Sequence, residues 1–334
     1  MSRVVGADPG TSSLDLLLLV DGLVADQARL TPEAQRLDPS LIPALLARWT
    51  PLDLITGPSG YGLPLLRGDS LTDKDLDLMA LVRPDERGKD LGVLGFRSWV
   101  RLFLDSGYPI VFLPGLIHLP TVPAHRKLNT IDLGTADKLA VAALALRQDA
   151  ETHAGGLENS TFAVLEIGSS FTAILVVSHG RLVDASAGTR GPIGLGSSGA
   201  WDGEVAYWRS PLSKNHLFQG GLKDLGAEGL DAFRESLLKH VSALRAVTPF
   251  DKIYLSGAGM LQTEIANAAI NALAPIALVS PLASLPDAWV KHSAQGAALL
   301  ADGLAGGPNA DLVASLRLHE ASGTVLDYLR PPLP

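Results

Sequence analysis

The sequence predicts an α/β protein built from two similar domains. Its 334 residues exceed the usual size of one domain and suggest two domains of about 150 residues each. The hydrophobic fraction of 47% and the charged fraction of 19% are typical of a folded globular chain. Three strands joined by two tight turns are expected near residue 8, and the same pattern recurs near residue 166.

A hairpin opens the first half of the chain. The apolar runs at 4–7 and 14–20 predict two strands around the turn at 8–13, and Asp21-Gly22 is a hairpin signal. The other elements expected in this half are a third strand at 23–25, helices at 39–49, 96–106 and 136–148, strands at 52–56 and 110–113, a charged loop with some helix at 68–92, and Thr135 as the N-cap of the last helix.

A polar break at 149–160 separates the predicted domains, 1–150 and 151–334. The opening pattern then recurs, with His179-Gly180 as the second hairpin turn. The elements expected after the break are strands at 161–167, 171–178, 181–185, 252–255 and 276–279, helices at 227–247, 260–274 and 288–303, and a long loop rich in Gly and Ser at 188–221. The helix at 288–303 is a candidate to pack back toward the cleft between the domains.

Composition and charge exclude several classes of protein. The net charge of −8 and the lack of any basic stripe argue against a nucleic-acid partner. The chain has no Cys, so it holds no disulfide, no Cys-bound zinc and no iron–sulfur cluster. No apolar run approaches the roughly 20 residues that span a bilayer, and no signal core follows the first Met, so we expect a cytoplasmic protein without a membrane partner.

Two turns have the residues that suit phosphate and metal binding. Backbone N–H groups and hydroxyls of a tight turn donate to phosphate oxygens, and a neighbouring carboxylate holds Mg²⁺, usually through water. Either turn alone is more often an ordinary turn, but two copies in equivalent positions are a stronger signal. The two turns are Asp8-Pro9-Gly10-Thr11-Ser12-Ser13 and Glu166-Ile167-Gly168-Ser169-Ser170.

A third turn, Ser256-Gly257-Ala258-Gly259, lies between a predicted strand and a predicted helix. Small residues there let a flat ligand approach the backbone and the helix N-terminus. On its own this is an ordinary strand-to-helix turn.

Together and in this order, the three turns resemble those of the actin-like ATPase superfamily, which includes sugar kinases, acetate and butyrate kinases and heat-shock ATPases. The resemblance implies two ribonuclease H-like domains with a cleft that binds ATP and Mg²⁺. It implies that Asp8 and Glu166 are the metal residues and that the residues binding the nucleotide are Asp8, Gly10, Thr11, Ser12, Ser13, Glu166, Gly168, Ser169, Ser170, Ser256, Gly257, Ala258 and Gly259.

Within the superfamily, the first turn is similar to the pattern of butyrate kinases. Two further segments resemble motifs of a group described as predicted butyrate kinases: Ile55-Thr56-Gly57-Pro58-Ser59-Gly60-Tyr61-Gly62 and Asp132-Leu133-Gly134-Thr135-Ala136-Asp137-Lys138. The chain departs from the pattern at Asp15, where a basic residue is expected, and at Glu166, which replaces a His. The resemblance implies an ATP-dependent phosphotransferase, with a short-chain carboxylate as the suspected acceptor.

The acceptor side is expected near the start of the helix at 136–148. Asp132 and Asp137 lie where related sugar kinases carry a base, and Lys138 would offset charge if the acceptor is an ionised carboxylate. A capped helix with Asp137 placed against its dipole explains the same residues without catalysis. The candidate substrate residues are Ser59, Tyr61, Arg126 and Arg190.

Two other functions fit the same nucleotide site. The protein would be an ATPase switch if hydrolysis drives domain closure on a protein partner, or a sensor if it binds nucleotide without turnover. Asp15 and the missing basic contacts favour the sensor. A homodimer is a further expectation, because superfamily members often dimerise.

Overall fold

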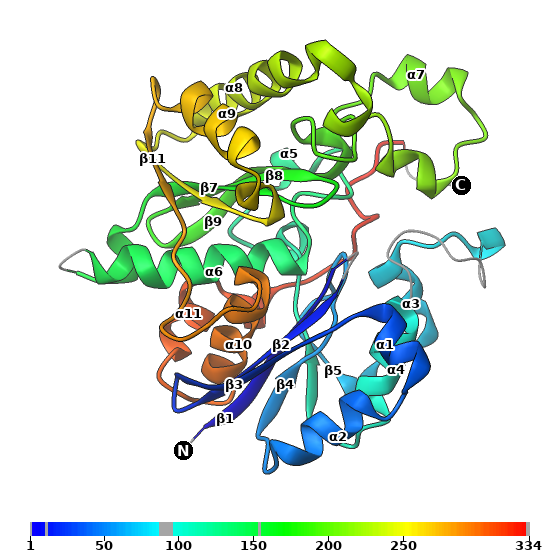
Figure 1. The fold of residues 1–334 in the computed structure, drawn as a ribbon, viewed down its shortest axis with the longest axis vertical. Helices are drawn as coiled ribbons and strands as arrows, with labels where there is room; N and C mark the ends of the chain where they lie inside the picture. Colours follow the sequence, from blue (N-terminus) through cyan, green and yellow to red (C-terminus); the bar gives the residue numbers. More distant parts are fainter. Residues whose placement is uncertain (1, 11–12, 87–95, 153–154, 332–334) are drawn as a thin grey trace.

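The structure, a computed structural model, describes residues 2–10, 13–86, 96–152 and 155–331. It consists of two α/β bodies, each built on one sheet, and helix α6 (Ala136–Glu151) lies between the two sheets (Figure 1). The predicted class, with its two similar sheets, is therefore confirmed. Thr11 and Ser12 of the first turn lie outside the described residues.

The first sheet has six strands in the order β3-β2-β1-β4-β6-β5. The opening hairpin is antiparallel, and β1 and β4 then pair in parallel. The third strand of the hairpin is longer than predicted because it pairs with β2 along its whole length. The strands are β1 (Arg3–Pro9), β2 (Leu14–Val20), β3 (Leu23–Leu30), β4 (Leu54–Thr56), β5 (Leu66–Arg67) and β6 (Ile110–Phe112).

The second sheet has five strands in the order β11-β10-β7-β8-β9. Its hairpin is also antiparallel, and its first strand also has a parallel partner on the other side. The repeat seen in the sequence is therefore a repeat of topology. The strands are β7 (Phe162–Ile167), β8 (Thr172–Ser178), β9 (Arg181–Ser186), β10 (Lys252–Ser256) and β11 (Leu278–Pro281).

The long predicted helices are present, with ends that differ by a few residues from the prediction. The predicted loop at 188–221 contains a short helix, α7, and several 3₁₀ turns. The predicted helix at 288–303 begins only at His292, which matters for the site. The helices other than α6 are α1 (Pro32–Leu37), α2 (Leu41–Arg48), α3 (Asp73–Ala80), α4 (Phe96–Leu104), α5 (Ala124–Lys127), α7 (Gly203–Trp208), α8 (Gly229–Val247), α9 (Thr263–Leu273), α10 (His292–Leu304) and α11 (Ala310–Ser315).

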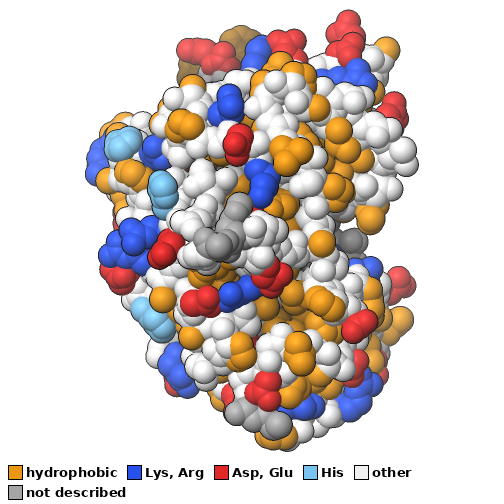
Figure 2. All heavy atoms as spheres, turned by 90° about the vertical axis from the view of Figure 1, so that its left-hand side faces the viewer, with side chains coloured by type: hydrophobic (Ala, Val, Ile, Leu, Met, Phe, Trp, Pro, Cys, Tyr) orange, Lys and Arg blue, Asp and Glu red, His pale blue; other side chains and the backbone are white. Residues whose placement is uncertain are grey.

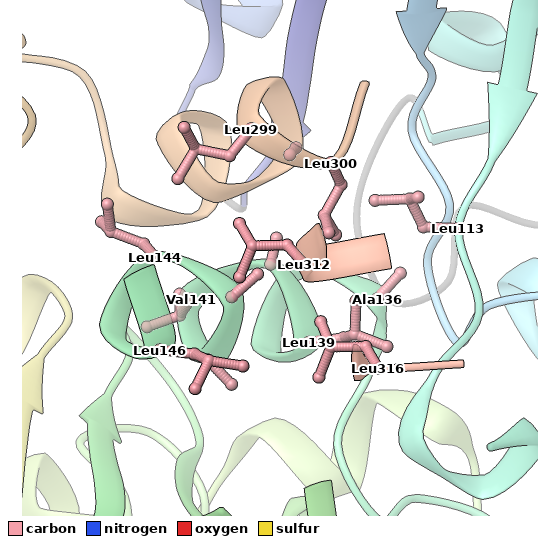
Figure 3. Packing of buried hydrophobic residues seen from close by; sticks show 14 of the residues in the cluster. Leu113, Ala136, Leu139, Val141, Leu144, Leu146, Leu299, Leu300, Leu312 and Leu316 are labelled. Carbon is pink, nitrogen blue, oxygen red and sulfur yellow. The ribbon is translucent and has the colours of Figure 1, made fainter. Parts of the chain in front are cut away.

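The largest core joins α6 and α10, whose apolar side chains interleave in Figure 3. The two helices cross closely: a Cβ added at Gly296 of α10 would lie 1.8 Å from the carbonyl oxygen of Ala140 in α6. α10 also packs on the first sheet, where a Cβ at Gly6 would lie 2.2 Å from the amide nitrogen of Ala298. The C-terminal part of the chain thus returns to the first sheet, and the division at residue 150 stays a prediction.

The surface drawn in Figure 2 carries basic and acidic side chains interspersed with hydrophobic ones. Among the described residues, every helix is too short or too polar to span a lipid bilayer.

Candidate active site

A cleft of about 810 Å³ opens between the two bodies. The turns that follow β1 and β7 border it, together with the first turn of α6 and the N-terminus of α10. Because β1 and β7 occupy equivalent places in two similar sheets, their turns meet across this space. The residues predicted for the site that line the cleft are Asp8, Gly10, Ser13, Ser59, Tyr61, Asp132, Asp137, Lys138, Glu166, Gly168, Ser169, Ser170, Ser256, Gly257 and Ala258.

Lys138 is held by two carboxylates at the centre of this cleft. Its Nζ lies 2.6 Å from Oδ2 of Asp137 and 2.7 Å from Oε2 of Glu166, which approaches from the second sheet. Burial opposes the charged form, but the two carboxylates prevail and raise the pKa of Lys138 above its ordinary value. Lys138 is therefore a permanent cation and is unsuited to act as a base near neutral pH.

The pKa values of the two neighbouring carboxylates are shifted in opposite directions. For Asp137, burial opposes ionisation, yet Lys138 lowers the pKa below its ordinary value, with a further hydrogen bond from Thr135. Burial raises the pKa of Glu166, and Lys138 offsets this only in part. Thr135 is the N-cap residue of α6, as predicted, but its hydroxyl bonds to the Asp137 carboxylate and not to the helix backbone.

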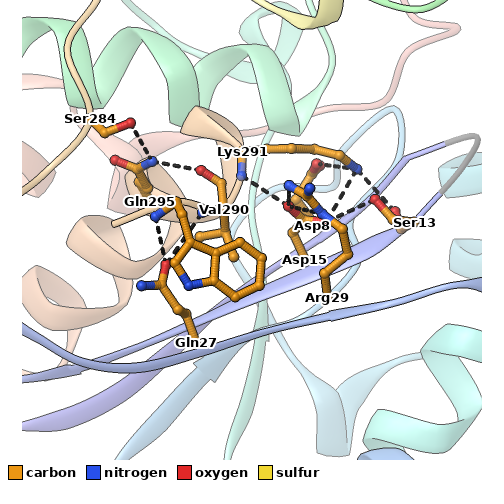
Figure 4. Close-up of polar contacts among 10 residues, drawn as sticks. Asp8, Ser13, Asp15, Gln27, Arg29, Ser284, Val290, Lys291 and Gln295 are labelled. Carbon is orange, nitrogen blue, oxygen red and sulfur yellow. Dashed lines mark hydrogen bonds and ion pairs between the residues drawn. The ribbon is translucent and has the colours of Figure 1, made fainter. Parts of the chain in front are cut away.

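Lys291 supplies a cation to the first turn (Figure 4). Its Nζ lies 3.5 Å from Oδ2 of Asp8 and donates to the carbonyl oxygen of Ser13 at 3.0 Å. A Cβ added at Gly10 would lie 2.5 Å from the same nitrogen. Burial raises the pKa of Asp8, and Lys291 is the first of the groups that lower it.

Asp15, the departure from the family pattern, has a structural role. It is fully buried and accepts bonds from Arg29 of β3 at 2.6 Å and from the backbone N–H of Lys291 at 2.9 Å. Gln27 of β3 accepts a bond from the backbone N–H of Trp289 at 2.8 Å, which fixes the same segment (Figure 4). The acid at position 15 therefore positions Lys291, a cation from a distant part of the sequence.

Asp132 and Tyr61 also line the cleft. Burial raises the pKa of Asp132, whose Oδ1 accepts the backbone N–H of Gly134 at 2.8 Å. Lys214, from the loop after β9, lies 4.8 Å from the centre of the Tyr61 ring and donates to the carbonyl oxygen of Leu81 at 3.3 Å. Burial lowers the pKa of Lys214 to about 8.

Three of the predicted site residues lie away from the cleft. Gly259 packs behind its turn, where a Cβ would lie 2.3 Å from Cγ2 of Ile167. Arg126 and Arg190 line a second cavity that shares no described residue with the cleft. They are not brought near Lys138, and we propose no substrate role for them in the cleft.

Sequence reasoning missed Lys291 and His292, both of which line the cleft. Nδ1 of His292 lies 2.9 Å from the hydroxyl of Ser256, so the start of α10 meets the third turn. The prediction placed both residues inside a helix starting at 288. The available signal was Pro286-Asp287, which delays the helix, followed by the polar run Lys291-His292-Ser293.

The cleft offers two carboxylates that fit Mg²⁺, those of Asp8 and Glu166. In the part of the chain that the structure describes, no three acidic or His side chains are grouped as a metal site. Mg²⁺ in phosphate sites usually takes one or two carboxylates together with water and phosphate oxygens, so two acids suffice. Asp8 and Glu166 both line the cleft, and each carboxylate is buried with a pKa raised by burial, which a cation would relieve.

Comparison with solved structures shows which fold this chain has. A propionate kinase from Francisella tularensis subsp. tularensis SCHU S4 is 14% identical, with a TM-score of 0.59 over 89% of this chain and 98% of that chain. An acetate kinase from Entamoeba histolytica is 11% identical, with a TM-score of 0.55 over 82% of this chain and 86% of that chain. These structures have the actin-like ATPase fold, and the likeness shows that this chain has it too.

The narrower resemblance to butyrate kinases stays a prediction. None of the curated proteins matches the sequence. A family model does match, over residues 6–331. The chain therefore belongs to the family described as "Protein of unknown function (DUF1464)".

Proposed function

We propose that the protein is an ATP-dependent phosphotransferase acting on a small molecule, with a short-chain carboxylate as the first candidate acceptor. One observation carries the proposal. The turns after β1 and β7 and the turn after β10 line a single cleft of about 810 Å³, together with Lys138 and Lys291. Glycine and hydroxyl turns with nearby cations are the groups that bind phosphates, and a cleft of this size has room for a nucleotide and a small acceptor.

Within this proposal the two halves share the nucleotide. Gly10 and Ser13 on one side and Gly168, Ser169 and Ser170 on the other would bind the phosphates. The turn from Ser256 to Ala258 would contact the nucleoside. Gly257 has a φ of +98° and lies against the backbone of Ile167, so this turn carries little side-chain bulk into the cleft.

Asp8 and Glu166 would hold Mg²⁺, mainly through water. The cleft lining contains four carboxylates, those of Asp8, Asp132, Asp137 and Glu166, against the cations of Lys138, Lys291 and Arg29. Arg29 is already paired with the buried Asp15, so negative charge is in excess. When bound, Mg²⁺ would neutralise phosphate charge and orient the phosphate oxygens.

A carboxylate acceptor suits the chemistry at Lys138. Such an acceptor is ionised near neutral pH and needs no base. One of its oxygens would attack the γ-phosphorus, the bond from that phosphorus to the bridging oxygen would break, and the products would be an acyl phosphate and ADP. Lys138 stays charged throughout, so it would lower the repulsion as the two anions meet.

A hydroxyl acceptor is the second candidate, and Asp132 favours it. A hydroxyl must lose its proton during attack, which a nearby carboxylate can accept. The carboxylate of Asp132 lines the cleft, and burial raises its pKa, which makes it a stronger base.

The test is an ATP turnover assay in the presence of Mg²⁺, with a panel of short carboxylates and polyols as acceptors. Stimulation by one class identifies the acceptor. We expect Asp132→Asn to leave a carboxylate reaction within about threefold and to slow a hydroxyl reaction by about a hundredfold or more. Hydrolysis at the same rate with and without every acceptor would favour the ATPase switch, and no ATP binding in calorimetry would overturn the proposal.

A separate experiment tests the proposed Mg²⁺ site. ATP binding is titrated with and without Mg²⁺ for the unaltered protein and for Asp8→Ala. We expect the gain in affinity produced by Mg²⁺ to be lost in the variant, because a carboxylate beside the metal is among its strongest interactions. The expectations of a cytoplasmic location and a homodimer remain part of this proposal.

A further inference from the structure

A second cavity, of about 440 Å³, lies where the segment around α5 meets β9 and the C-terminal half of α8. Its lining shares no described residue with the cleft. The polar part of its lining carries His125, Arg126, Arg190 and His240 with a single acid, Asp184. The cavity therefore combines two arginines with one carboxylate.

Arg126 has hydrogen-bonding capacity that the described residues leave unused. Its Nη1 donates to the carbonyl oxygen of Val183 at 2.8 Å and lies 3.3 Å from Oδ2 of Asp184. Its Nε is buried and has no hydrogen-bond partner among the described atoms. This nitrogen is closed off from the cavity, so Arg126 contributes its positive charge to the lining and not an open donor at Nε.

Arg190 completes the polar side. Its Nη1 donates to the hydroxyl of Thr130, and its backbone oxygen accepts a bond from Ser186 at 3.0 Å. The hydroxyl of Ser186 lies 2.9 Å from Nδ1 of His240, which fixes the ring at the edge of the cavity. Arg126 and Arg190 against Asp184 leave one net positive charge on this lining, which matches a monoanion better than a dianion.

The other side of the cavity is apolar and partly uncovered. Leu128, Leu244 and Val247 line it, and Leu128 and Val247 are 49% and 63% exposed. A bare phosphate ion would leave these side chains in water. An anion with an aliphatic body would cover them and remove their apolar surface from water.

We propose that this cavity binds an aliphatic monocarboxylate, with its head group at Arg126 and Arg190 and its chain against Leu128, Leu244 and Val247. The proposal combines a net single positive charge with exposed apolar side chains in one cavity. It does not depend on the activity proposed for the cleft.

The test is calorimetric titration of the full chain with sodium octanoate, with 1-octanol and inorganic phosphate as matched probes. We expect octanoate to bind at one site. Both other probes should bind at least tenfold more weakly, because 1-octanol lacks the carboxylate and inorganic phosphate lacks the aliphatic chain. Arg190→Gln should weaken octanoate binding about tenfold, the usual effect of losing a charge-assisted hydrogen bond. Val247→Asn should weaken it about threefold by removing apolar contact.

Arg234→Gln is the control. Arg234 is an arginine of the same helix as Val247, it pairs with Asp231 at 3.0 Å, and it does not line the cavity. Repeating the titration with Lys138→Ala shows whether octanoate occupies the cleft instead, because Lys138 lines the cleft and not this cavity. Binding that Lys138→Ala abolishes, or that survives both Arg190→Gln and Val247→Asn unchanged, overturns the proposal. Because Val247 is mostly exposed, its variant keeps the test valid if Arg190→Gln unfolds.

Discussion

Nζ of Lys138 lies 2.7 Å from Oε2 of Glu166, and this ion pair joins the helix between the two sheets to strand β7 of the second sheet. The two side chains are 14% and 11% exposed, so water screens the pair weakly. Asp137 holds the same ammonium group from within the first turn of α6. A cation is therefore fixed at the point where the two bodies meet.

We expect Lys138→Ala to reduce turnover about a hundredfold while ATP affinity changes little. Removing a cation from a water-excluded transition state typically costs about 3 kcal/mol. Steady-state kinetics with the acceptor identified in the panel, together with ATP calorimetry, would measure the two effects separately.

The control for Lys138→Ala is Lys239→Ala on α8. Lys239 also pairs with an acid, Glu235, at 2.5 Å, but its side chain is 73% exposed and lies outside the cleft. Lys239→Ala should change neither turnover nor ATP affinity. Wild-type turnover in Lys138→Ala would show that Lys138 is structural. A melting temperature far below that of the unaltered protein would show the same, since Glu166 then loses its partner.

Lys291→Met should weaken ATP binding about tenfold and reduce the dependence of that binding on salt. Nζ of Lys291 lies beside Asp8 and Gly10, where the phosphates are proposed to bind, and Met keeps most of the apolar stem. Calorimetry at two salt concentrations measures both changes. Equal affinity in the variant and the unaltered protein would mean that Lys291 only stabilises the first turn through Ser13 and Asp8.

The hairpins and long helices could be predicted because their signals are local. Asp21-Gly22 and His179-Gly180 determine where each hairpin turns, and the small-residue turns after β1, β7 and β10 follow directly from their strands. The cleft could be predicted because the three turns resemble those of the actin-like ATPase superfamily, which implies a cleft between two domains. Its general position thus needed no contact between distant residues.

The placements of Lys291, Arg126 and Arg190 could not be predicted from local sequence patterns. Lys291 reaches the first turn because Asp15 accepts its backbone N–H, a contact between residues 276 positions apart. The side chains of Arg126 and Arg190 turn to Val183 and Thr130, away from the cleft, and no local pattern encodes that choice. Tertiary contacts between distant segments decided these three placements.

Stability should fall with acidity in part because of His118. Burial lowers the pKa of His118 from 6.5 to about 4, so the unfolded chain takes up a proton near pH 6.5 while the folded chain does not. The unfolded state therefore binds more protons between these values, and stability is lost as the pH falls from 6.5 to 4. The effect amounts to about 2 kcal/mol between pH 6.5 and 5, at about 1.4 kcal/mol per pH unit.

Urea unfolding of the unaltered protein and of His118→Asn at pH 7 and pH 5 isolates this effect, because every other group titrates equally in both. We expect the difference in unfolding free energy between the two pH values to be about 2 kcal/mol smaller in the variant. An identical pH dependence in both proteins would mean that His118 takes up its proton in the folded state as well.

The close crossing of α6 and α10 should make position 296 intolerant of any side chain. In Gly296→Ala the new Cβ would lie 1.8 Å from the carbonyl oxygen of Ala140, so the two helices must move apart. Overpacking of this kind typically costs about 1–3 kcal/mol, and the lost contact between the helices adds to it. Gly203→Ala is the matched control, because a Cβ there meets nothing within 4 Å. Denaturant unfolding should show a clear loss of stability for Gly296→Ala and a change within about 0.5 kcal/mol for Gly203→Ala.

The start of α10 brings Lys291 and His292 to the cleft, so Gly296→Ala should also weaken ATP binding. Full stability together with full ATP affinity would contradict this packing.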